Sequence, residues 1–232
     1  MRRFTSVAAT AAATAALVAA VLSLAACEVR QLERGRAVEQ AASDVGERVQ
    51  ILRSHGGRYS KHGWNHYGPG YFELDRETGV LTSHGGMGLF WYATREYGDF
   101  VLELEFKTSD GATNSGVFVR VPGVPTSDDY IYHSFEIQID EAGEGVHQTG
   151  AVYDAEAPTE QASHPPGEWN RLKITMRGDH IAVEVNGAQV IDWEMEPRGK
   201  VEDFARRGYL GLQNHDDRSP VFFRNIYATA LN

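Results

Sequence analysis

Residues 134–140, Ser-Phe-Glu-Ile-Gln-Ile-Asp, alternate apolar and polar side chains without interruption. Successive side chains of a β-strand point to opposite faces of its sheet, so the phenylalanine and the two isoleucines predict a face turned to a core. The other face carries Glu136, Gln138 and Asp140, three hydrogen-bonding side chains in a row. A strand that needs only solubility more often carries Lys, Thr or Ser there. We therefore expect this row to form the floor of a sugar-sized cleft.

The same two-residue period runs through the rest of the chain from residue 56 onward. Alternation is clear in residues 100–107, 116–121 and 169–177, and an Asn-Gly pair between two later runs is a strong hairpin signal. No long helical pattern occurs in this part of the sequence. The short, regular spacing predicts about eleven or twelve strands in an all-β fold, an antiparallel β-sandwich of jelly-roll type.

The beginning of the chain has the pattern of a secretory signal. Arg2 and Arg3 precede an apolar, alanine-rich run over residues 7–26. Residues 24–27, Leu-Ala-Ala-Cys, resemble the lipobox of bacterial lipoproteins, in which the signal is cut before the Cys and its thiol receives a lipid. Cys27 is the only cysteine in the chain, which rules out an intramolecular disulfide. We expect an extracytoplasmic lipoprotein of the cell envelope, held to the membrane through Cys27; an uncleaved membrane anchor is the alternative.

The segment after the signal differs in composition from the rest. Residues 27–55 are rich in Glu, Arg, Gln and Ala and contain no aromatic residue and no Pro. Apolar residues recur there at roughly helical spacing. A solvated tether between lipid and domain is the expected structure, and a short helix docked on the domain is the alternative. The predicted organisation is a signal peptide over residues 1–26, this tether, and one domain over residues 56–232.

The charge of the chain argues against nucleic acid as a partner. Removing residues 1–26 removes two of the 22 basic residues and no acid, which leaves 20 basic and 32 acidic residues and a net charge of −12. Phosphate backbones bind to basic surfaces, so this balance excludes most nucleic-acid-binding proteins. It is compatible with a neutral ligand such as a sugar.

Polar side chains gather on one face of the predicted sheet. If the aliphatic sides of the inner strands form the core, the opposite face collects Phe118, Arg120, Glu136, Gln138, Asp140, Gln213 and His215. We expect Trp91, Tyr92 and Tyr153 close by. Carboxylates and amides match sugar hydroxyls, and aromatic rings stack on the apolar side of a pyranose, so the set is typical of a carbohydrate site.

Motifs spread along the chain resemble, in the same order, those of the 3-keto-disaccharide hydrolase family. They are residues 85–89 (Gly-Gly-Met-Gly-Leu), 97–100 (Tyr-Gly-Asp-Phe), 114–120 (Asn-Ser-Gly-Val-Phe-Val-Arg), 135–140, 149–153 (Thr-Gly-Ala-Val-Tyr), 167–170 (Gly-Glu-Trp-Asn), 185–187 (Val-Asn-Gly), 208–215 (Gly-Tyr-Leu-Gly-Leu-Gln-Asn-His) and 223–226 (Phe-Arg-Asn-Ile). The resemblance implies a concanavalin A-like sandwich. Gln138 stands where the Glu-x-Asp-x-Glu strand of glycoside hydrolase family 16 has its middle carboxylate, which argues against an ordinary retaining glycosidase.

The chemistry implied by this resemblance is elimination next to a ketone. A ketone at sugar carbon 3 acidifies the hydrogen on carbon 2; a base removes that hydrogen, the glycosidic oxygen leaves, and water then adds. We expect Glu136 or His215 to be the base, and Asp140 to raise the pKa of Glu136 by like-charge repulsion. Arg120, or a divalent metal held by acids and His215, would stabilise the enolate. The expected substrate-binding residues are Arg120, Gln138, Asn114, Phe118, Tyr153, Trp91 and Gln213.

Other interpretations of the same residues stay open. Arg120 and Glu136 could form a structural cross-strand ion pair. Glu136 and Asp140 lie about 13 Å apart on a straight strand, so they act on one bond only if the strand curves. His215 could stabilise a turn. For the whole domain, the alternatives are a non-catalytic carbohydrate-binding module and an ordinary glycosidase. An enzyme of the ketosugar type would depend on an oxidoreductase that makes its substrate; no cofactor is assigned.

Overall fold

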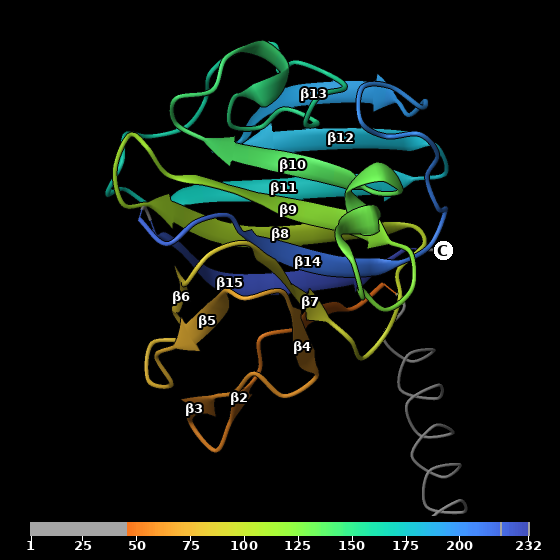
Figure 1. Cartoon of the computed structure of the whole chain (residues 1–232). Helices are drawn as coiled ribbons and strands as arrows, with labels where there is room; N and C mark the ends of the chain where they lie inside the picture. Colours follow the sequence, from red (N-terminus) through yellow and green to blue (C-terminus); the bar gives the residue numbers. More distant parts are fainter. Residues whose placement is uncertain (1–45, 219, 232) are drawn as a thin grey trace, which may run out of the picture. The chain divides into compact units, whose positions relative to one another are not determined.

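The computed structural model describes residues 46–218 and 220–231 (Figure 1). The predicted signal peptide, Cys27 and most of the predicted tether lie outside the described residues. Among the residues that are described, no helix is long and apolar enough to cross a membrane.

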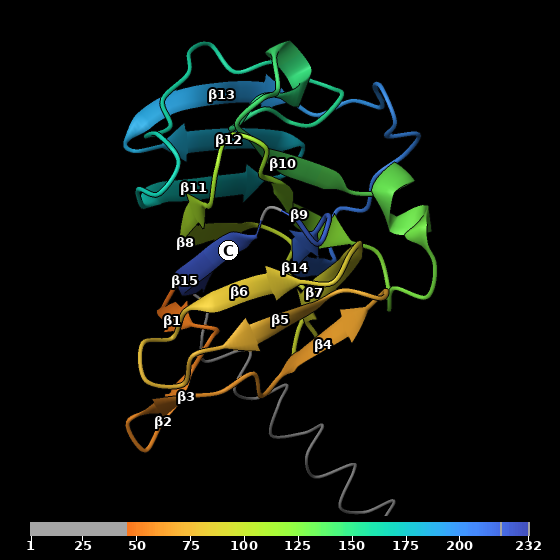
Figure 2. The ribbon, with the colours of Figure 1, turned by 60° about the vertical axis from the view of Figure 1, so that its left-hand side comes forward.

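Two antiparallel sheets form the domain, which confirms the predicted all-β sandwich (Figures 1 and 2). The eight-stranded sheet has the order β13 (Ala188–Glu194), β12 (His180–Val185), β11 (Asn170–Arg177), β8 (Phe100–Thr108), β15 (Val221–Ala230), β6 (Leu81–His84) and β5 (Tyr71–Leu74), with β1 (Arg48–Gln50) paired to β15. The five-stranded sheet has the order β10 (Phe135–Asp140), β9 (Asn114–Val121), β14 (Tyr209–Asn214), β7 (Gly88–Tyr92) and β4 (Trp64–Tyr67). A small hairpin, β2 (Ser54–His55) and β3 (Arg58–Tyr59), lies between β1 and β4 in the chain.

The core lies between the two sheets and follows the two-residue period. In β8 every second side chain is buried, beginning with Phe100. In β10, Phe135, Ile137 and Ile139 face the same core and are at most 1% exposed. A fully buried side chain of this size stabilises the fold by about 1.5–3 kcal/mol. The alternation seen in the sequence therefore sets which face of β10 is left for polar groups.

A second apolar cluster lies on the outer face of the five-stranded sheet. It consists of Leu89, Trp91, Phe118, Val121 and Tyr130. Tyr130 comes from the short 3-10 helix η1 (Asp128–Tyr132), whose start is capped by the hydroxyl of Ser127 accepting from the Asp129 amide. The segment that carries η1 thus roofs part of this face. A second 3-10 helix, η2 (Gly145–His147), follows β10.

Candidate active site

The strand register brings Glu136, Gln138 and Gln213 around one glycine. Gln138 on β10 pairs with Gly116 on β9, and the pairing of Leu212 with Val117 places Gln213 on the other side of Gly116. A methyl group at Gly116 would overlap the Glu136 carboxylate, so this carboxylate lies directly over the glycine. The missing side chain at Gly116 therefore creates the space that Glu136 occupies between the two glutamines.

Three buried polar atoms at this place have no hydrogen-bond partner among the described residues. They are Oε1 of Glu136, Oε1 of Gln213 and the hydroxyl of Tyr130, in side chains only 6%, 7% and 4% exposed. The Tyr130 ring packs edge-on against Phe118, with the centroids 5.0 Å apart. Buried polar groups are usually paired, because an unpaired one costs about 1–3 kcal/mol. Their gathering on one face indicates a site built to meet hydrogen-bonding groups of a ligand.

Burial raises the pKa of Glu136 to about 8, and the positive charge of Lys200 opposes that rise. The expectation that Asp140 raises this pKa is wrong, because burial is the cause. Asp140 instead closes a turn. Its Oδ1 accepts hydrogen bonds from the amides of Ala142 and Gly143 at 2.9 and 3.1 Å, and its Oδ2 accepts one from Asn114.

Lys200 and Tyr153 stand beside Glu136 on two different loops. The ammonium of Lys200 donates to the Tyr153 hydroxyl at 3.0 Å, and the Tyr153 amide donates to the carbonyl of Glu136 at 2.9 Å. Gly199 precedes Lys200 with a φ of +60°, and a side chain there would overlap the carbonyl of Asp154. The loop can press against the site only because residue 199 is a glycine.

The remaining polar side chains of the strand row form a chain of hydrogen bonds. Gln138 Nε2 donates to Asn114 Oδ1 at 3.4 Å, and Asn114 Nδ2 donates to Asp140 Oδ2 at 3.2 Å. Gln138 is 2% exposed, and Asn114 and Asp140 are partly exposed, so this chain runs from a buried side chain toward the surface. Glu136 is the member of the row whose carboxylate keeps an unpaired buried oxygen.

The aromatic residues predicted for the site differ in their positions. Trp91 and Phe118 do lie on the outer face, but they are buried in the second apolar cluster and form its floor. Tyr92 points to the core between the sheets, so its predicted place near the site is wrong. Tyr153 is partly exposed and borders Glu136 through its backbone and Lys200.

Arg120 is not at the site, and the prediction that it shares a face with Glu136 is wrong. Its φ is +55°, where the pairing of β9 with β14 shifts. The guanidinium donates to the carbonyls of Gly98 and Gly178 and to the carboxylate of Asp99, at 2.8–3.2 Å. The alternation predicts that Arg120 points outward, but the irregularity turns it toward the connection between β7 and β8 and the turn between β11 and β12.

His215 follows the end of β14 and is exposed, with Nδ1 3.3 Å from the Asp216 carboxylate. Among the described residues, no hydrogen bond or ion pair joins it to Glu136, and its role stays a prediction. Within the described part of the chain, no group of three or more His, Cys, Asp or Glu side chains is arranged to hold a metal ion. Two contributors were missed from the sequence, Tyr130 and Lys200, because both lie on segments without a strand period.

The sequence of residues 55–229 matches the family model of the 3-keto-alpha-glucoside-1,2-lyase-like domain. The chain belongs to this family. No curated protein matches the chain.

Three solved structures share the fold of this 3-keto-alpha-glucoside-1,2-lyase-like family member. A candidate glycosyl hydrolase from Parabacteroides distasonis is 29% identical, with a TM-score of 0.65, over 80% of this chain and 100% of that one. A second one from the same organism is 20% identical, with a TM-score of 0.67, over 84% and 97% of the two chains. A Bacillus subtilis protein of unknown function with a galectin-like fold is 10% identical, with a TM-score of 0.55, over 78% and 94%. The latter two likenesses concern the fold alone.

The raised pKa of Glu136 predicts that this family member loses stability as the pH rises. Between its ordinary pKa of 4.5 and about 8, the folded protein keeps a proton that the unfolded chain has lost. Stability therefore falls with rising pH through this window. Glu136→Gln has no charge to bury, so from pH 5 to pH 9 the wild type should lose on the order of 3 kcal/mol relative to this variant, or about 5–10 °C in Tm. Melting curves of both proteins at the two pH values check this. If the Tm of the wild type and of Glu136→Gln changed equally with pH, the raised pKa of Glu136 would be contradicted.

Proposed function

We propose that this protein cleaves 3-keto-glycosides by elimination and hydration, with Glu136 transferring the proton. Family membership and the glycosyl hydrolase neighbours support a carbohydrate-acting enzyme. The observation that carries the finer proposal is the carboxylate of Glu136, buried over Gly116 beside unpaired polar atoms from two other elements. A carboxylate with a pKa near 8 suits proton transfer from a carbon acid better than an ordinary one, because a base is most effective when its pKa lies near the operating pH.

The reaction begins with the substrate ketone at carbon 3 in the site. Glu136 removes the proton from carbon 2, and the electron pair of that bond moves into the ketone to form an enolate. Lys200 and the hydroxyl of Tyr130 are the donors available for the negative oxygen. Burial is the main cause that raises the pKa of Tyr130, so its hydroxyl stays protonated and donates a hydrogen bond rather than a proton.

The enolate then expels the glycosidic oxygen from carbon 1. That oxygen leaves with the bonding electron pair and takes the proton that Glu136 carries, which restores the carboxylate. Addition of one water across the new double bond places a hydroxyl on carbon 1 and a proton on carbon 2. The balance is one glycosidic bond broken and one water consumed, with no covalent glycosyl-enzyme.

The decisive experiment compares oxidised and unoxidised substrates. We expect release of ketosugar from 3-keto-trehalose or 3-keto-sucrose, and none of the corresponding sugar from trehalose or sucrose, as measured by product chromatography. Turnover of the unoxidised sugars would instead make the protein an ordinary glycosidase. Binding of the ketosugars without any turnover would make it a binding module. Because ketosugars must come from oxidation at carbon 3, an oxidoreductase is the class of enzyme that would supply the substrate.

The proposed place of this reaction is the cell envelope. The proposal depends on the signal over residues 1–26 and on Cys27, all outside the described residues. Labelling of the protein with a radioactive fatty acid in a bacterial host, and loss of the label in Cys27→Ser, is the expected result. A labelled Cys27→Ser variant would exclude Cys27 as the lipid site.

A further inference from the structure

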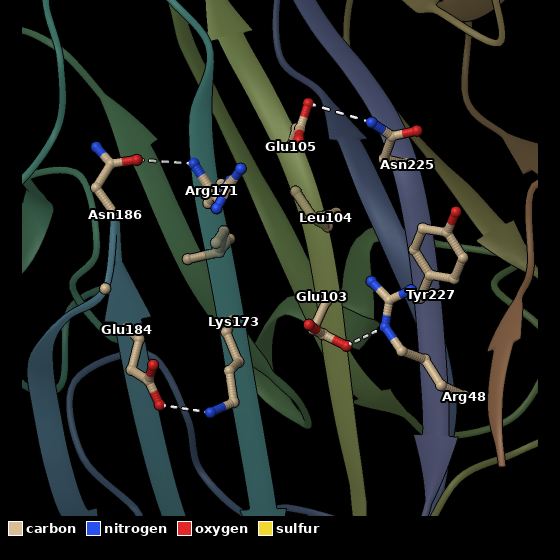
Figure 3. Close-up of a pocket in the computed structure, with 12 residues that line it drawn as sticks. Arg48, Glu103, Leu104, Glu105, Arg171, Lys173, Glu184, Asn186, Asn225 and Tyr227 are labelled. Carbon is tan, nitrogen blue, oxygen red and sulfur yellow. Dashed lines mark hydrogen bonds and ion pairs between the residues drawn. The ribbon is translucent and has the colours of Figure 1, made fainter.

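The outer face of the eight-stranded sheet carries a polar groove, on the side of the sandwich opposite to the candidate active site. Two hollows of about 510 and 380 Å³ lie there, and both are lined by Glu105, Arg171 and Asn186. The shared lining makes them neighbouring parts of one groove across β8, β11, β12 and β15. Figure 3 shows the larger part, with side chains from these strands and from β1.

Charges of both signs line the groove, and most of them are paired across strands. The ion pairs are Arg48 with Glu103 at 2.6 Å, Lys173 with Glu184 at 2.7 Å, and Arg224 with Glu105 at 2.6 Å. These three carboxylates are the only acids lining the two hollows, whereas the lining holds four Lys and Arg residues. The groove therefore carries one excess cation in a chain whose net charge is −10.

The excess cation is Arg171. It lies directly opposite Glu105 in the register of β11 and β8, yet no ion pair joins the two (Figure 3). The Glu105 carboxylate is turned the other way, where Oε2 accepts from Arg224 Nε at 2.6 Å and from Asn225 Nδ2 at 3.3 Å. The Arg171 side chain is exposed, and it forms no ion pair with any of the described residues.

A bulge in β15 is the cause of this arrangement. The register of β15 against β8 shifts between Arg224 and Tyr227, and Asn225 has a φ of +52°. As a result Arg224 and Asn225, two consecutive residues, both present donors to Glu105 on the outer face. Bulges and non-glycine residues with positive φ are over-represented at functional places. Here the bulge removes the natural partner of Arg171 and leaves the guanidinium free at the junction of the two hollows.

The chemistry of the groove selects the kind of ligand. A guanidinium fits a carboxylate with two parallel hydrogen bonds. Around Arg171, the side-chain oxygens of Glu105 and Asn225 are the groups that can accept from hydroxyls, whereas the Asn186 amide is held by Ala162, Asn170 and the Arg171 backbone. At one end, Arg224 lies over the ring of Trp169, 3.8 Å from its centroid. A polyanion such as nucleic acid would meet three carboxylates here, so a ligand with many hydroxyls and sparse negative charge fits better.

We propose that this groove binds acidic saccharides, with a uronate carboxylate held by Arg171. The site is separate from Glu136 and does not depend on the proposed reaction. It would hold the protein on a uronic acid-containing polysaccharide while the opposite face stays open to substrate.

Calorimetric titration with glucuronoxylan oligosaccharides, in which single glucuronates branch from a neutral xylan chain, tests the proposal, and the same oligosaccharides with the glucuronate methyl-esterified serve as the uncharged control. We expect binding of the acid forms only, weakened by 0.5 M salt because the charges are exposed (a screening length of about 4–5 Å). Arg171→Gln should lower the affinity about tenfold or more, since a charge-assisted hydrogen bond is lost. Arg177→Gln, which removes an exposed cation of the same strand outside both hollows, should leave the affinity unchanged.

Four binding results would overturn the proposal. They are no binding of the uronate oligosaccharides by the wild type, equal binding of acid and ester, equal losses in Arg171→Gln and Arg177→Gln, and loss of binding in Glu136→Gln. A second copy of the chain could also occupy this groove, and sedimentation of the wild type and of Arg171→Gln tests for it. A wild-type dimer that becomes a monomer in the variant would show that the groove joins two copies of the chain instead. Unchanged Tm in Arg171→Gln confirms that the variant is folded.

Discussion

Glu136→Gln should reduce the turnover of 3-keto-glycosides by about 10²–10⁴-fold, because the variant keeps the shape of the site and loses the proton-transfer group. The amide occupies the same space over Gly116 and can still meet a ligand hydroxyl. Ketosugar binding, measured by calorimetry, should therefore stay within a few fold of the wild type while kcat collapses. A variant that binds weakly and turns over normally once saturated would assign Glu136 to substrate binding instead.

The dependence of kcat/KM on pH provides a second test of Glu136. For the wild type, kcat/KM should rise with pH and level off near the pKa of about 8, because the carboxylate must be ionised to accept the proton. Glu160→Gln, which neutralises an exposed acid, is the matched control and should change neither rate nor profile. A wild-type profile that is already flat above pH 5 would mean that an ordinary carboxylate is the base.

Arg120→Met should lower the free energy of unfolding by about 3–5 kcal/mol, the second large effect that we expect. The Arg120 side chain is 1% exposed and makes three hydrogen bonds to Gly98, Asp99 and Gly178. Methionine fills a similar volume but leaves the carbonyls of Gly98 and Gly178 without this donor, and Asp99 keeps only the hydrogen bond from the Gly178 amide. Because three hydrogen bonds of a buried guanidinium are lost and the partly exposed Asp99 carboxylate loses its cation, Tm should fall by about 6–20 °C.

Arg206→Met provides the control for Arg120. Arg206 pairs with Asp179 close to the same region, but its side chain is 72% exposed. Exposed ion pairs contribute about 0–1 kcal/mol, so this variant should melt within a few degrees of the wild type. Equal destabilisation by the two substitutions would contradict a buried structural role for Arg120. The ketosugar kcat of folded Arg120→Met should be normal, since its guanidinium does not reach Glu136.

On the outer face of each sheet, one residue of a neighbouring strand leaves a charged side chain unpaired. On the five-stranded sheet, Gly116 removes a side chain and lets a carboxylate lie unpaired in a buried place. On the eight-stranded sheet, the bulge at Asn225 adds a donor and leaves Arg171 unpaired at the surface. In each case one residue of a neighbouring strand, a glycine or a bulged asparagine, decides which groups the charged residue meets.

The sequence by itself determined the sandwich and the face on which the site lies. The two-residue period is a local property of the backbone, so Phe135, Ile137 and Ile139 place Glu136 and Gln138 opposite the core whatever their neighbours are. Only the tertiary structure decided what surrounds Glu136. The register that sets Gly116 between two glutamines, the roof that brings Tyr130, and the loop that brings Lys200 are pairings between distant segments. Arg120 shows the limit most clearly, because a single positive φ turned it away from the face that its position in the alternation predicts.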